Sequence, residues 1–246
     1  MAQVAPGLGV PPIAQFAPVV DCAELTTREI NQAIRHLCDE GSADICIANP
    51  GARHNLAVAL VTSSRILFEG PVGWYCAGMN DGAHVIVKGN CGWGVAECSM
   101  SGLVEIHGHA GSGTAASIRG GLVYVEGNAG ARAGIAMKGG TLVVGGDVGY
   151  MSGFMMQRGT MIIGGNAADG LGDSMYEGLI YIAGSIESLG ADAVEAPLTD
   201  DDRATLRSAL AEFDLGKSPD DFRKIEAGRQ LWTFSTKEPE LWRGAL

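Results

Sequence analysis

The chain has few prolines, few basic residues and no long apolar run. Nine prolines among 246 residues exclude a collagen-like repeat or a proline-rich linker. Seventeen lysines and arginines against 28 aspartates and glutamates give a net charge of −11, which disfavours nucleic acid because phosphates need neutralising cations. No stretch approaches the roughly 18 apolar residues of a membrane span, and the N-terminus lacks the basic segment of a signal peptide. We therefore expect neither a nucleic-acid nor a membrane partner.

Cysteine pairs with the spacing of metal sites or disulfide frameworks are also missing. The six cysteines match neither pattern: Cys22, Cys38, Cys46, Cys76, Cys91 and Cys98. Reduced thiols are the simplest interpretation, and they predict a cytoplasmic location. Hydrophobic residues make up 46% of the chain, which is too many for a disordered protein.

Glycine, by contrast, is abundant, and its positions repeat. Thirty of the 37 glycines lie between Gly70 and Gly190. From Gly70 onward, glycine recurs every nineteen residues. We expect these glycines to be structural: Gly70, Gly89, Gly108, Gly127, Gly146, Gly165 and Gly184. Apolar residues stand two and four positions before each of these glycines. The residue directly before each glycine is polar in the early units and small in the later ones.

This repeat predicts an all-β fold, a single-stranded β-helix (solenoid) of about seven 19-residue coils. Each coil returns the chain above its start, so the strands stack in parallel about 4.8 Å apart. The apolar columns then form a continuous core, and the residue before each glycine faces outward. The corners require either a positive φ or a close neighbouring backbone, and glycine permits both.

Three segments follow from the repeat: residues 1–65 as an N-terminal arm, helix and cap, 66–192 as the β-helix, and 193–246 as a C-terminal helix and aromatic arm. The flanking helices cap a solenoid whose open ends would otherwise aggregate. Trp232 and Trp242 in the aromatic arm are candidates for contact with another subunit.

Local signals place both helices. Thr26 and Glu29 have the spacing of a capping box, and Gly41 follows an apolar stripe at helical spacing. Thr199 precedes three aspartates, whose charges are favourable in the first turn of a helix.

Side chains that could take part in catalysis or ligand binding are sparse, and we expect no catalytic, cofactor-binding or metal-binding residue on this chain. His107 and His109 could place two imidazoles on one strand face, but no third ligand is nearby, so an outward surface position is expected. Strings such as GNCGWG lack the strand–turn–helix context of a dinucleotide site.

The best polar cluster lies in NPGARHNL, just before the first repeat. Its residues could cap the solenoid or contact another subunit, and arginines within the coils are further contact candidates. The candidate interface residues are therefore Arg53, His54, Asn55, Arg119, Arg132 and Arg158, together with the two tryptophans of the aromatic arm.

The glycine columns resemble the GXGXG β-helix family, which includes the C-terminal domain of the glutamate synthase large subunit. The resemblance covers roughly residues 44–192 and is carried by NPGARHNL, GNCGWGVAE, GNAGARAGIAMKGG, GYMSGFMMQRG and LGDSMYEG. REINQAIRHL and DFRKIEAGRQLW are similar to the glutamate-synthase-like subunits of methylamine–glutamate N-methyltransferases (N-methylglutamate synthases).

The resemblance implies a non-catalytic assembly subunit without its own cofactor. Its expected partners are a class II amidotransferase-like subunit and a synthase-like subunit that carries FMN and an iron–sulfur cluster. Such a complex would convert glutamate and methylamine into N-methylglutamate and ammonia. The alternatives are the β-helix C subunit of a formylmethanofuran dehydrogenase or formyltransferase/hydrolase complex, and a stand-alone β-solenoid that binds or scaffolds other molecules.

Overall fold

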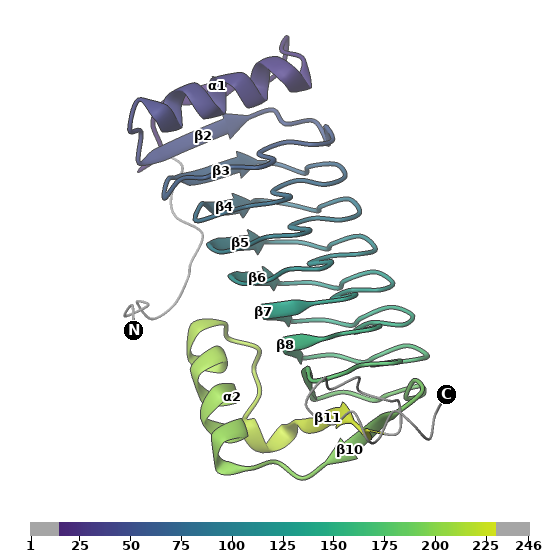
Figure 1. Ribbon diagram of the computed structural model, residues 1–246. Coiled ribbons are helices and arrows are strands. Elements are labelled where there is room, and N and C mark those ends of the chain that lie inside the picture. Colours follow the sequence, from purple (N-terminus) through teal and green to yellow (C-terminus); the bar gives the residue numbers. More distant parts are fainter. Residues whose placement is uncertain (1–14, 230–246) are drawn as a thin grey trace, which may run out of the picture.

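The computed structural model describes residues 15–229 as a β-solenoid built on one eleven-stranded sheet (Figure 1). Neighbouring coils are in register at nineteen residues, so that Val85 pairs with Val104 and Val104 with Val123. The seven coils contribute parallel strands β3 (Arg65–Glu69), β4 (His84–Val87), β5 (Leu103–Ile106), β6 (Leu122–Val125), β7 (Lys138–Val144), β8 (Arg158–Ile163) and β9 (Leu179–Ile182). The predicted fold class is confirmed.

The predicted core columns are buried along the whole stack. Ile66 and Phe68 of β3 are fully buried, and their equivalents in the following coils are at most 1% exposed. Three residues after the end of β3, Val72 begins a second column of parallel bridges, which continues through Cys91 and Ala110 at the same spacing. The strands and these bridges together enclose a continuous apolar core.

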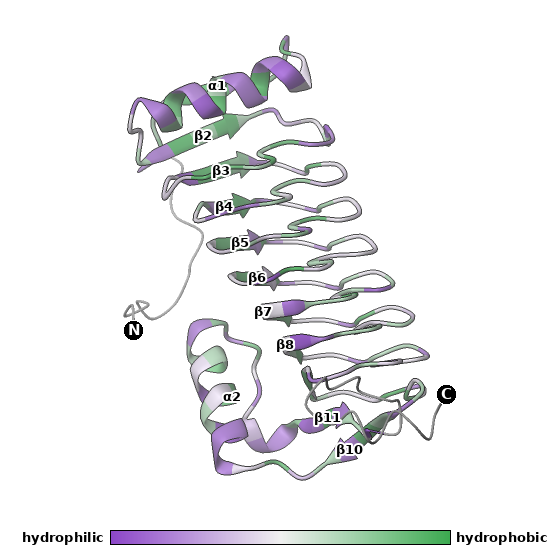
Figure 2. Ribbon diagram, in the orientation of Figure 1, coloured by the Kyte–Doolittle hydropathy of each residue, from purple (hydrophilic) through white to green (hydrophobic). Residues whose placement is uncertain are grey.

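The N-terminal end is covered by helix α1 (Thr27–Asp39), which lies over β2 (Asp44–Ala48). Its buried Ile30 and Ile34 join the solenoid core, and Figure 2 shows hydrophilic residues on the remaining surface of the helix. The predicted capping box is present, because Thr26 accepts the Glu29 N–H and Glu29 accepts the Thr26 N–H. The short strand β1 (Val19–Asp21) pairs with β2 and completes this end of the sheet.

At the C-terminal end, the sheet reverses direction instead of continuing the coil. Strand β11 (Arg223–Ala227) pairs antiparallel with β9, and β10 (Ala193–Ala196) pairs antiparallel with β11. Helix α2 (Asp200–Glu212) and the short 3₁₀ helix η2 (Pro219–Asp221) connect these two strands. Helix α2 flanks the strands of the later coils, so the strand pair rather than the helix covers this end (Figure 1).

The outward face of the strands differs from the sequence expectation of polar or small residues. The column three residues before each glycine also faces outward, and it is apolar and buried at both ends of the stack. Phe16 covers Leu67 and Ile86 near the N-terminus. Near the C-terminus, side chains of α2 and the segment after it pack over Tyr124, Val143, Ile162 and Tyr181.

The structural glycines serve mainly the close approach of neighbouring coils. A positive φ occurs at Gly70 and Gly89, but not at the other five repeat glycines. At Gly165, a Cβ atom would lie 2.6 Å from the carbonyl oxygen of Gly146 in the preceding coil. Of the two reasons for glycine considered above, the lack of space dominates in the later coils.

Candidate functional site

His107 and His109 do not converge on a common site. His109 is a rung of a hydrogen-bonded ladder: its N–H donates to Asn90 Oδ1, and its Nδ1 accepts the Asn128 N–H, both at 2.9 Å. The ladder continues through side chains of Asn128, Asp147 and Asn166. Because Nδ1 accepts a hydrogen bond, it carries no proton. Within residues 15–229, no three histidine, cysteine or acidic side chains are arranged to hold a metal ion.

His107 occupies a polar cluster instead of an ordinary surface position, which corrects the sequence expectation. Its side chain is 12% exposed, and its Nδ1 lies 3.0 Å from Glu126 Oε2. Glu105 is 3% exposed, lies 3.3 Å from His107 Nε2 and also contacts His84 Nε2. Glu105 therefore interrupts the outward apolar column between the part covered by Phe16 and the part covered by α2.

Glu105 and His107 each stabilise the charged form of the other. Burial raises the pKa of Glu105, but side-chain contacts with His107 and His84 outweigh it and lower the pKa overall. The contact with Glu105 is in turn the largest cause of the raised pKa of His107. His107 Nε2 lies within ion-pair distance of Glu105, although the pair is not aligned as a hydrogen bond, and the other contacts of the cluster are also between its own members, so its geometry indicates a stabilising role.

We expect Glu105→Gln to remove part of the pH dependence of stability. The raised pKa of His107 stabilises the fold at low pH, and this contribution is lost as pH rises through that pKa. The variant should therefore lose about 1 kcal/mol near pH 6, and less at higher pH. Thermal melts between pH 6 and 8 test this, with exposed Glu187→Gln as the control. Parallel pH profiles for Glu105→Gln and the unmodified protein would contradict the assignment.

The buried cysteines of the coils are not activated nucleophiles. All six are unpaired, in agreement with the sequence interpretation. Burial raises the pKa of the Cys76 thiol to about 12, and Cys91 is shifted in the same direction for the same reason. A buried thiol with a raised pKa forms little thiolate, so these side chains act as small core residues.

The NPGARHNL segment joins the first coil to the N-terminal cap. The Arg53 guanidinium donates to the carbonyl oxygens of Asn49, Pro50 and Ala23 at 3.1–3.3 Å. The Asn55 carbonyl accepts a hydrogen bond from the Asn31 side chain of α1 at 2.7 Å. These contacts support the capping interpretation, and a role in subunit contact stays a prediction for both residues.

His54 begins a stack of exposed rings along the solenoid. Its Nδ1 accepts the Trp74 N–H at 2.9 Å, and its ring lies 4.6 Å from the Trp74 ring, centre to centre. Trp74 stacks in turn on Trp93 at 5.4 Å. Trp74 and Trp93 are nineteen residues apart and so occupy the same place in neighbouring coils, and His54 extends the stack by one ring, so the stack forms a ridge parallel to the solenoid axis.

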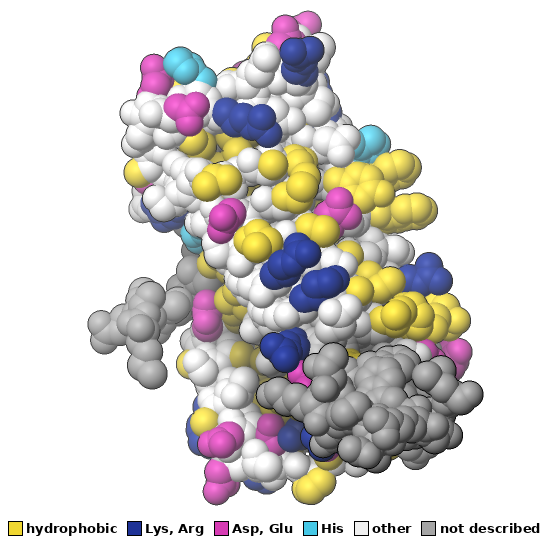
Figure 3. Space-filling model, in the orientation of Figure 1, with side chains coloured by type: hydrophobic (Ala, Val, Ile, Leu, Met, Phe, Trp, Pro, Cys, Tyr) yellow, Lys and Arg dark blue, Asp and Glu magenta, His cyan; other side chains and the backbone are white. Residues whose placement is uncertain are grey.

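This ridge belongs to a larger surface that we call the turn wall, made by residues 74–81, 93–100, 112–119, 131–138, 150–157 and 169–176. Of the twelve large hydrophobic residues that are exposed in the described part of the chain, eight lie on it, which makes it the main apolar surface. They are Trp74, Tyr75, Met79, Trp93, Met100, Tyr150, Met155 and Tyr176. Figure 3 shows hydrophobic side chains projecting along the turn side of the molecule.

The predicted interface arginines within the coils lie on this wall or at its edge. Arg119 and Arg132 are exposed on the turn wall. Arg158 is exposed at the start of β8, where it forms an ion pair with Glu177 at 3.0 Å. Trp232 and Trp242 lie outside the described residues.

Sequence reasoning missed the turn wall because it considered each ring singly. The signal was present in the repeat: the position four residues after the glycine holds Trp74, Trp93 and Tyr150. Three large rings in one column of a surface coil are a recognisable pattern once the register is known.

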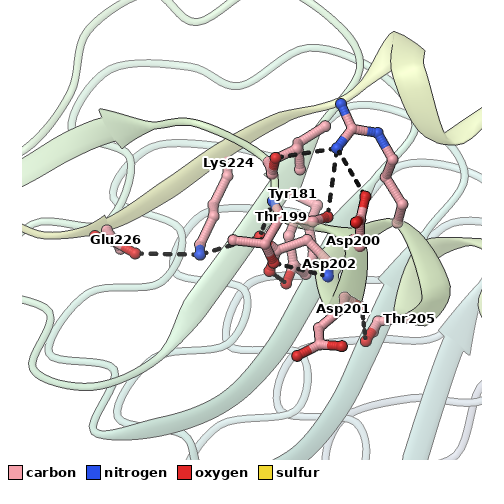
Figure 4. Close-up of polar contacts among 10 residues, drawn as sticks. Tyr181, Thr199, Asp200, Asp201, Asp202, Thr205, Lys224 and Glu226 are labelled. Carbon is pink, nitrogen blue, oxygen red and sulfur yellow. Dashed lines mark hydrogen bonds and ion pairs between the residues drawn. The ribbon is translucent and has the colours of Figure 1, made fainter.

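A second buried polar cluster fixes α2 to the sheet (Figure 4). The Tyr181 hydroxyl donates to Asp202 Oδ1 at 2.5 Å, and Lys224 Nζ lies 3.2 Å from Asp202 Oδ2. Asp202 also completes a capping box with Thr199, at the helix start that the three aspartates indicated. Glu226 pairs with Lys224 at 3.3 Å, so the cluster is internally satisfied.

Comparison with known proteins finds one partial similarity. Over 70 residues, the chain is 41% identical to Protein GlxC of Rhizobium meliloti (strain 1021). The match spans 28% of this chain and 30% of that protein, so less than a third of either is covered. No family model matches the chain. None of the helices in the described part is long and apolar enough to cross a membrane.

Proposed function

We propose that this chain is the β-solenoid assembly subunit of a glutamate-synthase-type enzyme complex. The observation that carries the proposal is the turn wall, where eight large hydrophobic side chains are exposed on one rigid surface. Interfaces between proteins are enriched in tryptophan, tyrosine, methionine and arginine, and all four are present here. Isolated proteins rarely expose so many apolar side chains together. A stand-alone solenoid would leave this surface without a partner.

Two similarities support the glutamate-synthase type. The glycine columns resemble the GXGXG β-helix family, and part of the chain is similar to Protein GlxC. We further propose that the complex is a methylamine–glutamate N-methyltransferase. The amidotransferase-like chemistry and the FMN and iron–sulfur chemistry would then belong to partner subunits, and this chain would hold them in place.

Purification of the affinity-tagged chain from its native cells tests the proposal. We expect it to elute in a large complex with an amidotransferase-like subunit and a yellow flavoprotein, because the turn wall needs a partner surface. Absorbance near 450 nm and mass spectrometry of the subunits are the measurements. Recovery of a clean monomer would contradict the complex, and recovery of metallohydrolase and formyltransferase subunits would favour the formylmethanofuran-type alternative.

A further inference from the structure

A groove of about 400 Å³ crosses the turn wall beside the aromatic ridge. Tyr75 and Trp93 line one side, and Arg132 and Ile135 line the other. Most of the residues between them are small: Gly94, Ser112, Gly113, Ala116 and Ala131. Glu97 also lines the groove. The groove therefore has a floor of small residues and an aromatic wall, and its charged side chains are Arg132 and Glu97.

The groove exists because the column of rings is interrupted for two coils. Trp74 and Trp93 stack, but the next two residues in the column are Ser112 and Ala131, and the ring returns at Tyr150. Trp93 is 56% exposed although Trp74 stacks on it, and it lines the groove. A gap of two coils, each about 4.8 Å high, accepts a side chain of aliphatic or aromatic size.

The turn wall is cationic around the groove, although its outermost coils add Asp81, Asp169 and Asp173. From residue 93 to residue 157, the turn wall carries Arg119, Arg132 and Lys138 against the single carboxylate of Glu97. The chain as a whole carries a net charge of −11. This local excess of cations favours an acidic partner surface, and it steers association with one.

We propose that this groove receives an apolar side chain, flanked by carboxylates, from a loop of a partner subunit. The inference rests on the proposed function and adds the location and chemistry of one contact. The apolar side chain would pack against Trp93 over the small floor residues, and a carboxylate beside it would pair with Arg132. Buried aromatic and arginine side chains are the residues that most often dominate binding energy at protein interfaces.

Surface substitutions in the tagged complex test the proposal. Trp93→Ala and Arg132→Glu should each raise the dissociation constant of the complex about tenfold or more, measured by mass photometry over a dilution series. Arg207→Glu, an exposed arginine of α2, makes the same charge change away from the groove and should have no effect. Unchanged thermal melts of the three isolated variants would exclude misfolding as the cause.

Photo-cross-linking identifies the occupant. With benzoylphenylalanine in place of Trp93, we expect cross-links in native cells to one partner peptide that has aspartate or glutamate beside an apolar residue. A complex that forms normally with Trp93→Ala and Arg132→Glu would overturn the groove assignment while leaving the proposed function intact. Cross-links to a second copy of this chain, or to a peptide without carboxylates, would overturn it as well. A lone monomer would instead overturn the proposed function itself.

Discussion

Gly165→Ala is expected to lower the free energy of unfolding by about 3 kcal/mol, at the upper end of overpacking effects. The added Cβ would lie 2.5 Å from the carbonyl carbon of Gly146 and 2.6 Å from its oxygen, and it would also collide with the Asp147 side chain. These atoms belong to the preceding coil, whose backbone is held in place because the Gly165 N–H donates a hydrogen bond to the Gly146 carbonyl oxygen at 3.0 Å. Relief of the clash therefore requires the two coils to separate.

Gly113→Ala is the matched control for this effect. The nearest atom to its added Cβ is the Gly94 nitrogen at 3.9 Å, so there is space, but φ is +70°. The cost is then only backbone strain, about 1 kcal/mol. Thermal and urea unfolding of both variants give the comparison. Equal destabilisation would show that conformation and not space explains the glycine at position 165.

Asp202→Ala is expected to destabilise the attachment of α2 by about 3 kcal/mol, as is usual when one partner of a buried ion pair is removed. The Asp202 side chain is 7% exposed and that of Lys224 is 11% exposed. Without the carboxylate, the Tyr181 hydroxyl and the Lys224 ammonium would lose their shared acceptor in a buried position. Hydrogen exchange should accelerate in α2 and β11 more than in the central coils.

The neighbouring residue provides the control. Asp201 lies in the same first turn of α2 but is exposed, so Asp201→Ala removes a charge from the helix without unpairing a buried group. We expect its effect to stay below about 1 kcal/mol. Similar exchange rates in the two variants would show that the cluster does not hold the helix.

The contribution of Asp202 to the stability of the fold should decrease as the pH becomes acidic. Burial opposes ionisation of Asp202, but hydrogen bonds from Tyr181 and Thr199, and then from Lys224, outweigh it and lower the pKa to about 2. A carboxylate with a lowered pKa stabilises the fold above its unfolded pKa near 4, and this contribution is lost as pH falls towards 2. Acid unfolding of Asp202→Ala should lack this part of the transition.

The solenoid and its helix starts could be predicted from the sequence because both depend on short, repeated spacing. Val85 pairs with Ile66 in one neighbouring coil and with Val104 in the other, so the spacing of the apolar residues determines the nineteen-residue register. The capping boxes at Thr26 and Thr199 depend on residues three positions apart.

The residues that cover the outward face of the strands could not be predicted in the same way. Phe16 contacts the column of Leu67 and Ile86, and Asp202 contacts Tyr181, at separations unrelated to the repeat. The environment of His107 was misjudged for this reason, although one signal was present: Glu105 is the single charged residue in a column that is otherwise apolar or aromatic within the coils.

The reversal of the sheet at β11 also changes the edge that the solenoid presents at its C-terminal end. A repeating coil is in principle able to grow without end, because each β-strand offers the next molecule the same unpaired edge. Here the β9 edge is already occupied by an antiparallel strand of its own chain. At this end of the described part of the chain, a second molecule would meet the short antiparallel edge strand β10 instead of a parallel coil strand, so no coil edge is presented for continuation of the stack.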